Sequence, residues 1–488
     1  MTCRVSLHRV DPRFVLPHRV NRAVVLGGLH DWEAGLSSAG IELVDAATDG
    51  AELVVAPPGL AETARATRAR SMIIEGSRER ALKGPEYRVR RLLLRPTRQR
   101  PTLALPLDQP AAVSYALEHW SVVDRHWKRA RLRGAQALVA RGLFPSWGSP
   151  IVTVTTRDGG PPLIVTAARD LGIPREVGWF LTFGQGDALS RNAFQLFLPG
   201  RGGPEWVLKF ARVAGYSQRF DNDEAGLRLA QEAGGAVAAH APRLVGRFEV
   251  DGLHASVETF AAGRRLRDVL ITPGDRARKL RLIEQIAAWI LELGRSTQAP
   301  PEAMAPELHR LRTEVVPTWA SLSAGSDLID ELPRLVAVTQ HNDLGAWNVV
   351  AGDQDFVVLD WENTRRDALP LWDLVYFLGN ALVLLDGQYT AEELPRRMTQ
   401  LFAGETAASS LLFTWIRRGA EAAAVPAEAV AAIATLCWLS HSLSAREHNV
   451  DIATFTPRDP PRVHGLEGIA QAWMAHPALG PGWSVWRR

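Results

Sequence analysis

The chain has 488 residues, too many for a single hydrophobic core, so its length predicts two or three domains. Hydrophobic residues make up 46% and aromatic residues 7% of the chain, an ordinary globular composition that excludes a fibrous or largely disordered protein. The formal net charge is only +3, and the two cysteines, Cys3 and Cys437, exclude a disulfide framework and lack metal-ligand spacing.

The compartment can be inferred from the same features. The charged residues Arg4, Arg9 and Asp11 leave no room for the apolar segment of a signal peptide, and the cysteine usage fits a reducing environment. An apolar stretch at residues 369–385 carries an internal Asp and an Asn, which are costly inside a membrane. We therefore expect a cytoplasmic protein with no membrane span.

Basic residues are concentrated in the first third of the chain. Residues 1–170 contain 25 Lys and Arg against 16 Asp and Glu, a local net charge of about +9. This excess fits either a solvated, arginine-rich surface or an anionic partner at the basic N-terminal half. No aromatic-interleaved basic ribbon accompanies it, so we do not expect a nucleic-acid partner.

The first hundred residues predict an α/β domain. Short apolar runs at residues 23–26, 52–56, 71–74 and 91–94 alternate with helix-length polar segments, as in a parallel sheet. Gly27-Gly28 follows the first run without the G-x-G-x-x-G spacing, which fits a structural turn or a nucleotide-binding turn. The segment faintly resembles a methyltransferase-like Rossmann core. We predict a Rossmann-like domain with a connecting helix over residues 1–148.

A second domain is predicted from residue 149. Strand-like segments at 179–183 and 192–197 flank the turn Gly184-Gln185-Gly186-Asp187, whose glycines would let the backbone approach phosphates. A plain hairpin turn would look the same. Downstream, Lys209 is one of only four lysines in the chain and lies in an apolar strand, and Glu224 opens a helical run.

The loop His341–Asn348 carries the chemistry. Asp343 and Asn348 are five residues apart, and Asp360 ends the apolar run 357–359 about a dozen residues later. Phosphoryl transfer from ATP needs a carboxylate to orient the attacking hydroxyl and two oxygen ligands to hold Mg²⁺. We therefore assign Asp343 as the catalytic residue, and Asn348 and Asp360 as metal ligands.

The order of these strands, helices and loop residues along 175–445 resembles that of the aminoglycoside phosphotransferase and choline kinase family. Members of this family are small-molecule relatives of the protein kinases. The resemblance implies an α+β, two-lobed protein kinase-like fold that uses ATP and Mg. Its small lobe would occupy residues 149–262, and its helical large lobe residues 263–488. No A-P-E segment follows Asp360, which argues against a peptide substrate.

The resemblance also implies roles for the residues that would hold ATP. Lys209 would bind the α- and β-phosphates, and Glu224 would pair with that lysine. A surface lysine and an ordinary acid at a helix start are the alternative. The remaining nucleotide-binding residues would be two glycines of the turn and two residues of the adenine-binding linker: Gly184, Gly186, Glu258 and Phe260. His341 is expected to be a scaffold for the loop, and Glu362 to add a metal or water contact.

Two residues depart from the family pattern. Asn342 stands where a glycine is usual, and Trp347 stands where a small residue usually precedes the asparagine. These departures fit either a change of specificity or a degenerate site. Asp373 is expected to be a helix N-cap and loop anchor.

These features predict an ATP- and Mg-dependent phosphotransferase acting on a hydroxyl of a small molecule, of the sugar, aminoglycoside or amino alcohol class. One alternative is a pseudokinase, a nucleotide-binding regulatory or scaffold module. A second enzyme in the first domain, such as a methyltransferase, lacks the expected glycine signature.

Overall fold

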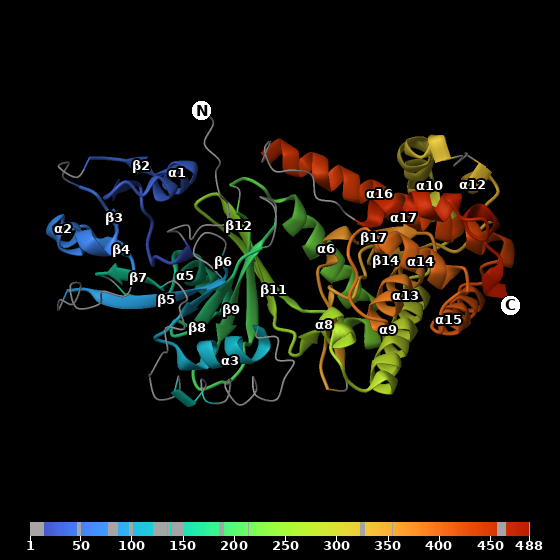
Figure 1. Ribbon diagram of the computed structural model, residues 1–488, viewed down its shortest axis with the longest axis horizontal. Helices are drawn as coiled ribbons and strands as arrows, with labels where there is room; N and C mark the ends of the chain where they lie inside the picture. The colour runs from blue at the N-terminus through green and yellow to red at the C-terminus, as the bar shows by residue number, and fades with distance from the viewer. Residues whose placement is uncertain are drawn as a thin grey trace. The chain divides into compact units, whose positions relative to one another are not determined.

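The computed structural model divides the chain into two compact units, whose elements are labelled in Figure 1. The first, which we call the sheet unit, comprises Met1–Ser217 and Leu244–Phe260. The second, the helical unit, comprises Gln218–Arg243 and Ala261–Arg488. The residues that the structure describes are 14–45, 50–76, 86–96, 101–120, 134, 137–138, 151–157, 159–184, 190–212, 214–322, 327–353, 355–455 and 465–487.

A single mixed sheet runs through the described part of the sheet unit, in the order β11-β12-β10-β9-β8-β6-β5-β7-β4-β3-β1-β2. Its strands are β1 (Arg22–Val25), β2 (Glu42–Leu43), β3 (Leu53–Ala56), β4 (Ser71–Glu75), β5 (Arg88–Pro96), β6 (Pro101–Pro106), β7 (Ile151–Thr156), β8 (Gly178–Thr182), β9 (Asn192–Phe197), β10 (Trp206–Phe210), β11 (Leu244–Val250) and β12 (Leu253–Thr259). Its helices are α1 (His30–Ser38), α2 (Ala61–Ala66), α3 (Pro110–Trp120) and α5 (Leu163–Ala167), with 3-10 turns at Pro58–Leu60 and Ala168–Leu171.

The strands β2, β1, β3 and β4 are parallel neighbours in that order. Their aliphatic residues are buried throughout β3 and β4, as expected for strands covered on both faces. The parallel arrangement predicted for the first three apolar runs is therefore confirmed. It is wrong for the run at 91–94, which lies in β5 and pairs antiparallel with β6 and β7. A Rossmann-like domain over 1–148 stays a prediction.

The turn after β1 shows why two glycines stand there. Gly27 has a φ of +74°, and a Cβ added to it would lie 2.7 Å from Cγ of Pro57. The loop after β3 thus packs directly on this turn, at the edge where open α/β sheets usually bind ligands. Close packing between two loops accounts for Gly27 without a bound nucleotide.

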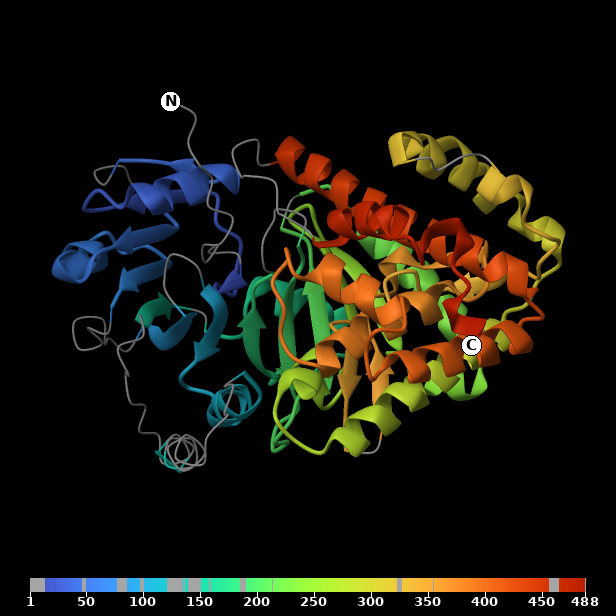
Figure 2. The ribbon, with the colours of Figure 1, turned by 45° about the vertical axis from the view of Figure 1, so that its right-hand side comes forward.

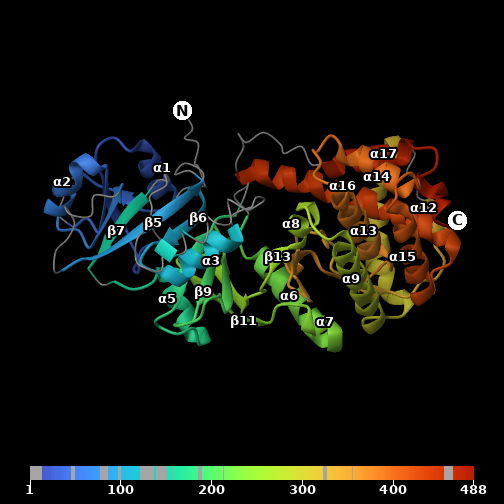
Figure 3. The ribbon, with the colours of Figure 1, turned by 60° about the horizontal axis from the view of Figure 1, so that its bottom comes forward.

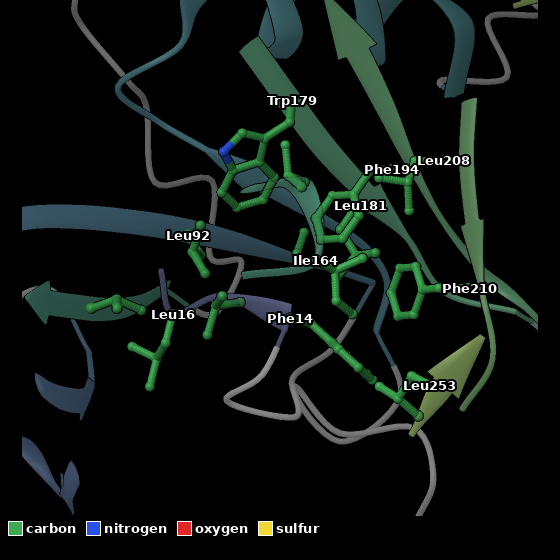
Figure 4. Close-up of a cluster of buried hydrophobic side chains, with 14 of the residues drawn as sticks. Phe14, Leu16, Leu92, Ile164, Trp179, Leu181, Phe194, Leu208, Phe210 and Leu253 are labelled. Atoms are coloured by element: carbon green, nitrogen blue, oxygen red, sulfur yellow. The ribbon is translucent and has the colours of Figure 1, made fainter. Parts of the chain in front are cut away.

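The N-terminal strands and the predicted small lobe share one sheet and one core. β8 pairs with β6, and β7 lies between β4 and β5. Phe14 and Leu16 belong to the same buried cluster as Trp179 of β8 and Phe210 of β10 (Figure 4). The boundary predicted after residue 148 therefore does not separate two cores. After α3, residues 121–133 lie outside the described residues, so the predicted connecting helix stays a prediction there.

The helical unit contains mainly helices, which Figures 2 and 3 show from two further directions. Its helices are α6 (Gln218–Ala233), α7 (Gly235–Ala239), α8 (Leu266–Ile271), α9 (Arg276–Ser296), α10 (Ala305–Arg310), α11 (Val316–Thr318), α12 (Asp327–Asp330), α13 (Trp372–Leu385), α14 (Leu394–Phe402), α15 (Ser409–Ala422), α16 (Ala427–Phe455) and α17 (Gly465–Ala475). Shorter helical turns are η8 (Trp361–Asn363), Pro301–Met304, Leu311–Val315, Ala320–Leu322, Gly480–Gly482 and Val485–Arg487. Its strands are β13 (Arg264–Arg265), β14 (Val338–Gln340), β15 (Val349–Ala351), β16 (Phe356–Val358) and β17 (Arg365–Ala368).

The apolar stretch at 369–385 forms α13, and every residue of that helix is buried. It packs against α9, α14, α15 and α16 and is a core helix of this unit. In the part of the chain that the structure describes, no single helix has the length and apolar character of a membrane span. Ser409–Ala422 and Ala427–Glu447 reach that character only as a pair bent by 113°.

The shared core of the sheet unit can be tested with Leu16→Ala. Leu16 is fully buried, so its truncation should lower the free energy of unfolding by about 2–5 kcal/mol. Because one core supports both groups of strands, hydrogen exchange measured by mass spectrometry should speed up in β8 and β9 as well as in β1 and β3. The matched control is Leu43→Ala, whose side chain is 39% exposed. Faster exchange confined to β1 and β3 would contradict a single core.

Candidate active site

The loop His341–Asn348 connects β14 to β15 in the helical unit. β15 pairs antiparallel with β16, and the N–H of Leu359 donates to the carbonyl of Asn348 at 2.7 Å. Because this hairpin doubles back, it brings Asn348 and the segment leading into Asp360 to the same end. The short, hydrogen-bonded hairpin of β15 and β16 therefore connects the two predicted metal ligands, Asn348 and Asp360.

Helix α13 holds the backbone of this loop. The carboxylate of Asp373 accepts the N–H groups of His341 at 2.6 Å and Asn342 at 2.8 Å. Two turns further along, Asn380 Oδ1 accepts the N–H of Ala346 at 2.8 Å. The expected anchoring role of Asp373 is confirmed, but its capping role is wrong, because the N-cap of α13 is Leu371. Burial raises the pKa of Asp373 to about 6, against the lowering effect of its two backbone hydrogen bonds.

Both departures from the family pattern have a local explanation. Asn342 has a φ of +62°, a left-handed conformation that glycine favours and asparagine tolerates better than most residues. The ring of Trp347 lies across Gly345, where a Cβ would come within 2.4 Å of the indole. Arg265 donates to the carbonyl of Trp347 at 2.5 Å. Asn342 thus adopts the backbone conformation that a glycine would adopt. The indole of Trp347 packs on Gly345, where any side chain would clash with it.

His341 has the contacts of a scaffold residue. Its Nε2 lies 2.9 Å from the carbonyl of Leu359, to which it donates, and its Nδ1 accepts the N–H of Asp343 at 3.3 Å. Burial lowers the pKa of His341 to about 4, so the ring is neutral. Nε2 thus ties the loop to the segment before Asp360, while Nδ1 accepts a hydrogen bond within the loop.

Both carboxylate oxygens of Asp343 accept hydrogen bonds. Oδ2 accepts from Nδ2 of Asn348 at 3.0 Å, and Oδ1 accepts from the hydroxyl of Tyr376 at 3.4 Å. Burial is the main cause that raises the pKa of Asp343 to about 7, and the charges of Glu362 and Asp360 add to it. The two hydrogen bonds act in the opposite direction. Three carboxyl groups therefore influence one another at this site.

The segment that carries Asp360 is fixed by α6. Asp360 has a φ of +60°, and the next N–H, from Trp361, donates to Oδ1 of Asp223 at 2.9 Å. A Cβ added to Gly226 would lie 2.3 Å from the carbonyl oxygen of Trp361, so helix and segment touch backbone to backbone. Arg219, one turn before Asp223, lies 3.8 Å from Glu362.

The donor set at this site fits Mg²⁺ held together with phosphates. Among the described residues, no group of three or more His, Cys, Asp or Glu side chains could hold a metal ion. Mg²⁺ is commonly bound by one or two protein oxygens, with waters and substrate phosphates completing the shell. Asn348 and Asp360 offer such a pair. A cation beside them would also offset the charges of Asp360 and Glu362, which contribute to the raised pKa of Asp343.

In the sheet unit, Lys209 forms an ion pair with Glu258. The Nζ–Oε1 distance is 2.9 Å, and both side chains are buried. Strands β10 and β12 pair antiparallel with Lys209 opposite Ser256, which places Glu258 diagonally on the same face. The side chain of Glu258 thus holds the ammonium group of Lys209. The predicted contact of the backbone near Glu258 with adenine stays a prediction.

The other predicted nucleotide-binding residues have these surroundings. The N–H of Phe260 donates to the carbonyl of Glu205 at 3.0 Å, so an adenine contact would have to use other backbone groups. A Cβ on Gly184 would lie 2.5 Å from the carbonyl of Arg191, so the hairpin itself requires this glycine. Gly186 lies outside the described residues. Glu224 belongs to the helical unit and pairs with Arg228 at 2.5 Å, and its pairing with Lys209 stays a prediction.

Sequence reasoning missed residues that shape the site from neighbouring helices. Tyr376 and Asn380 follow Asp373 at positions i+3 and i+7, one face of α13, and all three bond the loop. Polar residues at this spacing in an otherwise apolar helix could have predicted that one face of α13 contacts the loop. Asp223 and Gly226 carried no comparable signal, because only the packing of α6 on η8 reveals their role.

The contact between α6 and the Asp360 segment can be tested with Gly226→Ala. The added methyl group has no space against the Trp361 carbonyl, so the variant should lose about 1–3 kcal/mol of stability. Thermal unfolding measures this loss. Gly35→Ala is the matched control, since nothing lies within 4 Å of a Cβ there and the helix should tolerate or favour alanine. Equal melting temperatures for Gly226→Ala and the parent would contradict the close contact.

No family model and no curated protein matches the sequence. Solved structures that resemble the chain include one from Ralstonia eutropha with a provisional assignment as an aminoglycoside phosphotransferase, at 14% identity and a TM-score of 0.41, covering 66% of this chain and 97% of that one. A glucosamine kinase is 13% identical with a TM-score of 0.32, covering 63% and 83%. An aminoglycoside-3'-phosphotransferase of type VIII is 17% identical with a TM-score of 0.33, covering 57% and 98%. We therefore take the function from the geometry of the site, not from these neighbours.

Proposed function

We propose that this chain is an ATP- and Mg²⁺-dependent phosphotransferase that moves the γ-phosphate to a hydroxyl of a small molecule. The observation that carries the proposal is the Asp343 carboxylate. It is partly accessible, is bonded by Asn348, and is close enough to Asp360 and Glu362 for their charges to raise its pKa. A carboxylate beside an acidic, metal-fitting pair is the arrangement that phosphoryl transfer needs.

In the proposed reaction, Asp343 accepts a hydrogen bond from the acceptor hydroxyl and aims its oxygen at the γ-phosphorus. As the new oxygen–phosphorus bond forms and the bond to ADP breaks, Asp343 takes the hydroxyl proton. Asn348 and Asp360 would hold Mg²⁺, and the bound cation would neutralise charge developing on the phosphoryl oxygens. Lys209, fixed by Glu258, is assigned to the α- and β-phosphates.

The acceptor is a small molecule in this proposal, with sugars, aminoglycosides, amino alcohols and nucleoside-like compounds as the classes to test. Trp347 is the residue beside Asp343 that departs most from the family pattern, and its ring is only half-buried. It also lies edge-on to Tyr376, with ring centroids 6.2 Å apart. We assign Trp347 to recognition of the acceptor.

The pseudokinase alternative rested on Asn342 and Trp347. The positive φ of Asn342 and the packing of Trp347 on Gly345 give both residues a place in an ordered loop. Both residues therefore belong to an ordered loop, and measurements of phosphate transfer decide between the two alternatives. An anionic partner for the basic N-terminal residues and a cytoplasmic location stay predictions.

The assignment of Asp343 can be tested with Asp343→Ala. Phosphate transfer from Mg·ATP is measured over a panel of small hydroxyl compounds, with release of ADP as a second readout. Removal of the positioned carboxylate should lower kcat by about 10²-fold or more. Glu405→Ala, an exposed acid in a loop of the same unit, is the control and should match the parent.

Two results would count against the proposal. A parent-like rate for Asp343→Ala would remove the catalytic role of Asp343. Tight binding of Mg·ATP by the parent, without transfer to any member of a broad panel, would favour the pseudokinase alternative.

A further inference from the structure

Three polar residues of α13 face the catalytic loop, but they act on different parts of it. In the loop, Asp373 and Asn380 accept from backbone N–H groups, those of His341, Asn342 and Ala346. Asn380 also donates to the hydroxyl of Tyr389 at 3.4 Å. Tyr376 alone reaches a reacting group, because its hydroxyl lies 3.4 Å from Oδ1 of Asp343. The same helix therefore fixes both the path of the loop and the direction of its carboxylate.

We propose that Tyr376 is a positioning residue that holds the Asp343 carboxylate in its productive rotamer, and that His441 acts through Tyr376. This role rests on the proposed phosphotransferase function. With Asn348 bonded to Oδ2 and Tyr376 to Oδ1, rotation of the carboxylate about χ2 would break both hydrogen bonds. A carboxylate restrained in this way meets the acceptor hydroxyl at little further entropic cost.

The hydroxyl of Tyr376 donates to the Asp343 carboxylate. Burial raises the pKa of Tyr376 well above its usual value, and the charge of Asp343 raises it further. The phenol is therefore protonated at neutral pH, and its hydrogen bond orients Asp343.

The ring of Tyr376 is held by a face-to-face contact with His441 of α16. The two ring centroids are 3.7 Å apart and the planes differ by 12°. Trp438, also on α16, packs against the same tyrosine with centroids 6.0 Å apart. The orientation of the Tyr376 hydroxyl thus depends on α16 as well as α13.

His441 is a buried ring at this contact. Its Nε2 has no hydrogen-bond partner within the described parts of the chain. Burial lowers the pKa of His441 to about 3, so the ring is neutral and stacks on Tyr376 without adding a charge near Asp343. A planar, neutral ring is what this contact requires.

Tyr376→Phe tests the positioning role, because it removes the hydroxyl and keeps the ring. We expect kcat for phosphate transfer to fall about tenfold, as for one lost orienting contact, while KM for ATP changes less than about twofold. The control is Tyr87→Phe, which removes another buried tyrosine hydroxyl, bonded to the Ala69 carbonyl in the sheet unit. That control should lose stability but no rate.

The link through His441 is tested by a double-mutant cycle. His441→Ala should lower kcat in the parent but have no further effect in Tyr376→Phe, because it acts through the missing hydroxyl. His441→Phe, which keeps a planar ring, should restore the rate. Thermal unfolding of each variant separates these effects from loss of the fold.

The outcomes distinguish this role from the function on which it rests. If the parent transfers phosphate and Asp343→Ala does not, an unchanged kcat for Tyr376→Phe overturns the positioning role alone. Additive effects of His441→Ala and Tyr376→Phe overturn the assignment of His441. A parent chain without any transfer overturns the proposed function and the role of Tyr376 together.

Discussion

The candidate site depends on one buried carboxylate, that of Asp373. It accepts the N–H groups of two consecutive residues, His341 and Asn342, and so sets the direction in which the catalytic loop leaves β14. Two donors on one carboxylate require a tight backbone turn, and Asn342 supplies it through its left-handed conformation. Loss of this interaction would free the loop on which Asp343 and Asn348 are placed. The other contacts of the loop hold individual residues in place, whereas Asp373 sets the path of the loop backbone.

Two helices confine the acidic cluster from different directions. Helix α13 holds the loop that carries Asp343, while α6 holds the segment that carries Asp360 through Asp223 and the close approach of Gly226. Burial is the main cause that raises the pKa of Asp343, and the charges of Glu362 and Asp360 add to it. Under the proposed function, a cation held by Asn348 and Asp360 would offset these charges.

Sequence reasoning found the parts of the site that are local in the chain. The run from His341 to Asn348 and the strand before Asp360 are contiguous, so their residue types carried the signal. The ion-pair partner of Lys209 could not be predicted from the sequence, because the diagonal contact with Glu258 depends on the register of β10 against β12. The single sheet of the sheet unit was also hidden, since the pairing of β8 with β6 joins segments far apart in sequence. Long-range pairing and helix packing account for most of what was missed.

The central claim is that Asp360 and Asn348 bind a divalent cation together with ATP. Calorimetric titration of the parent with ATP, in Mg²⁺ and in EDTA, tests this claim most directly when repeated with Asp360→Asn. We expect Mg²⁺ to strengthen binding of ATP to the parent by about tenfold or more, and the substitution to abolish that gain. Equal affinities with and without Mg²⁺, or a full Mg²⁺ effect in Asp360→Asn, would contradict the account.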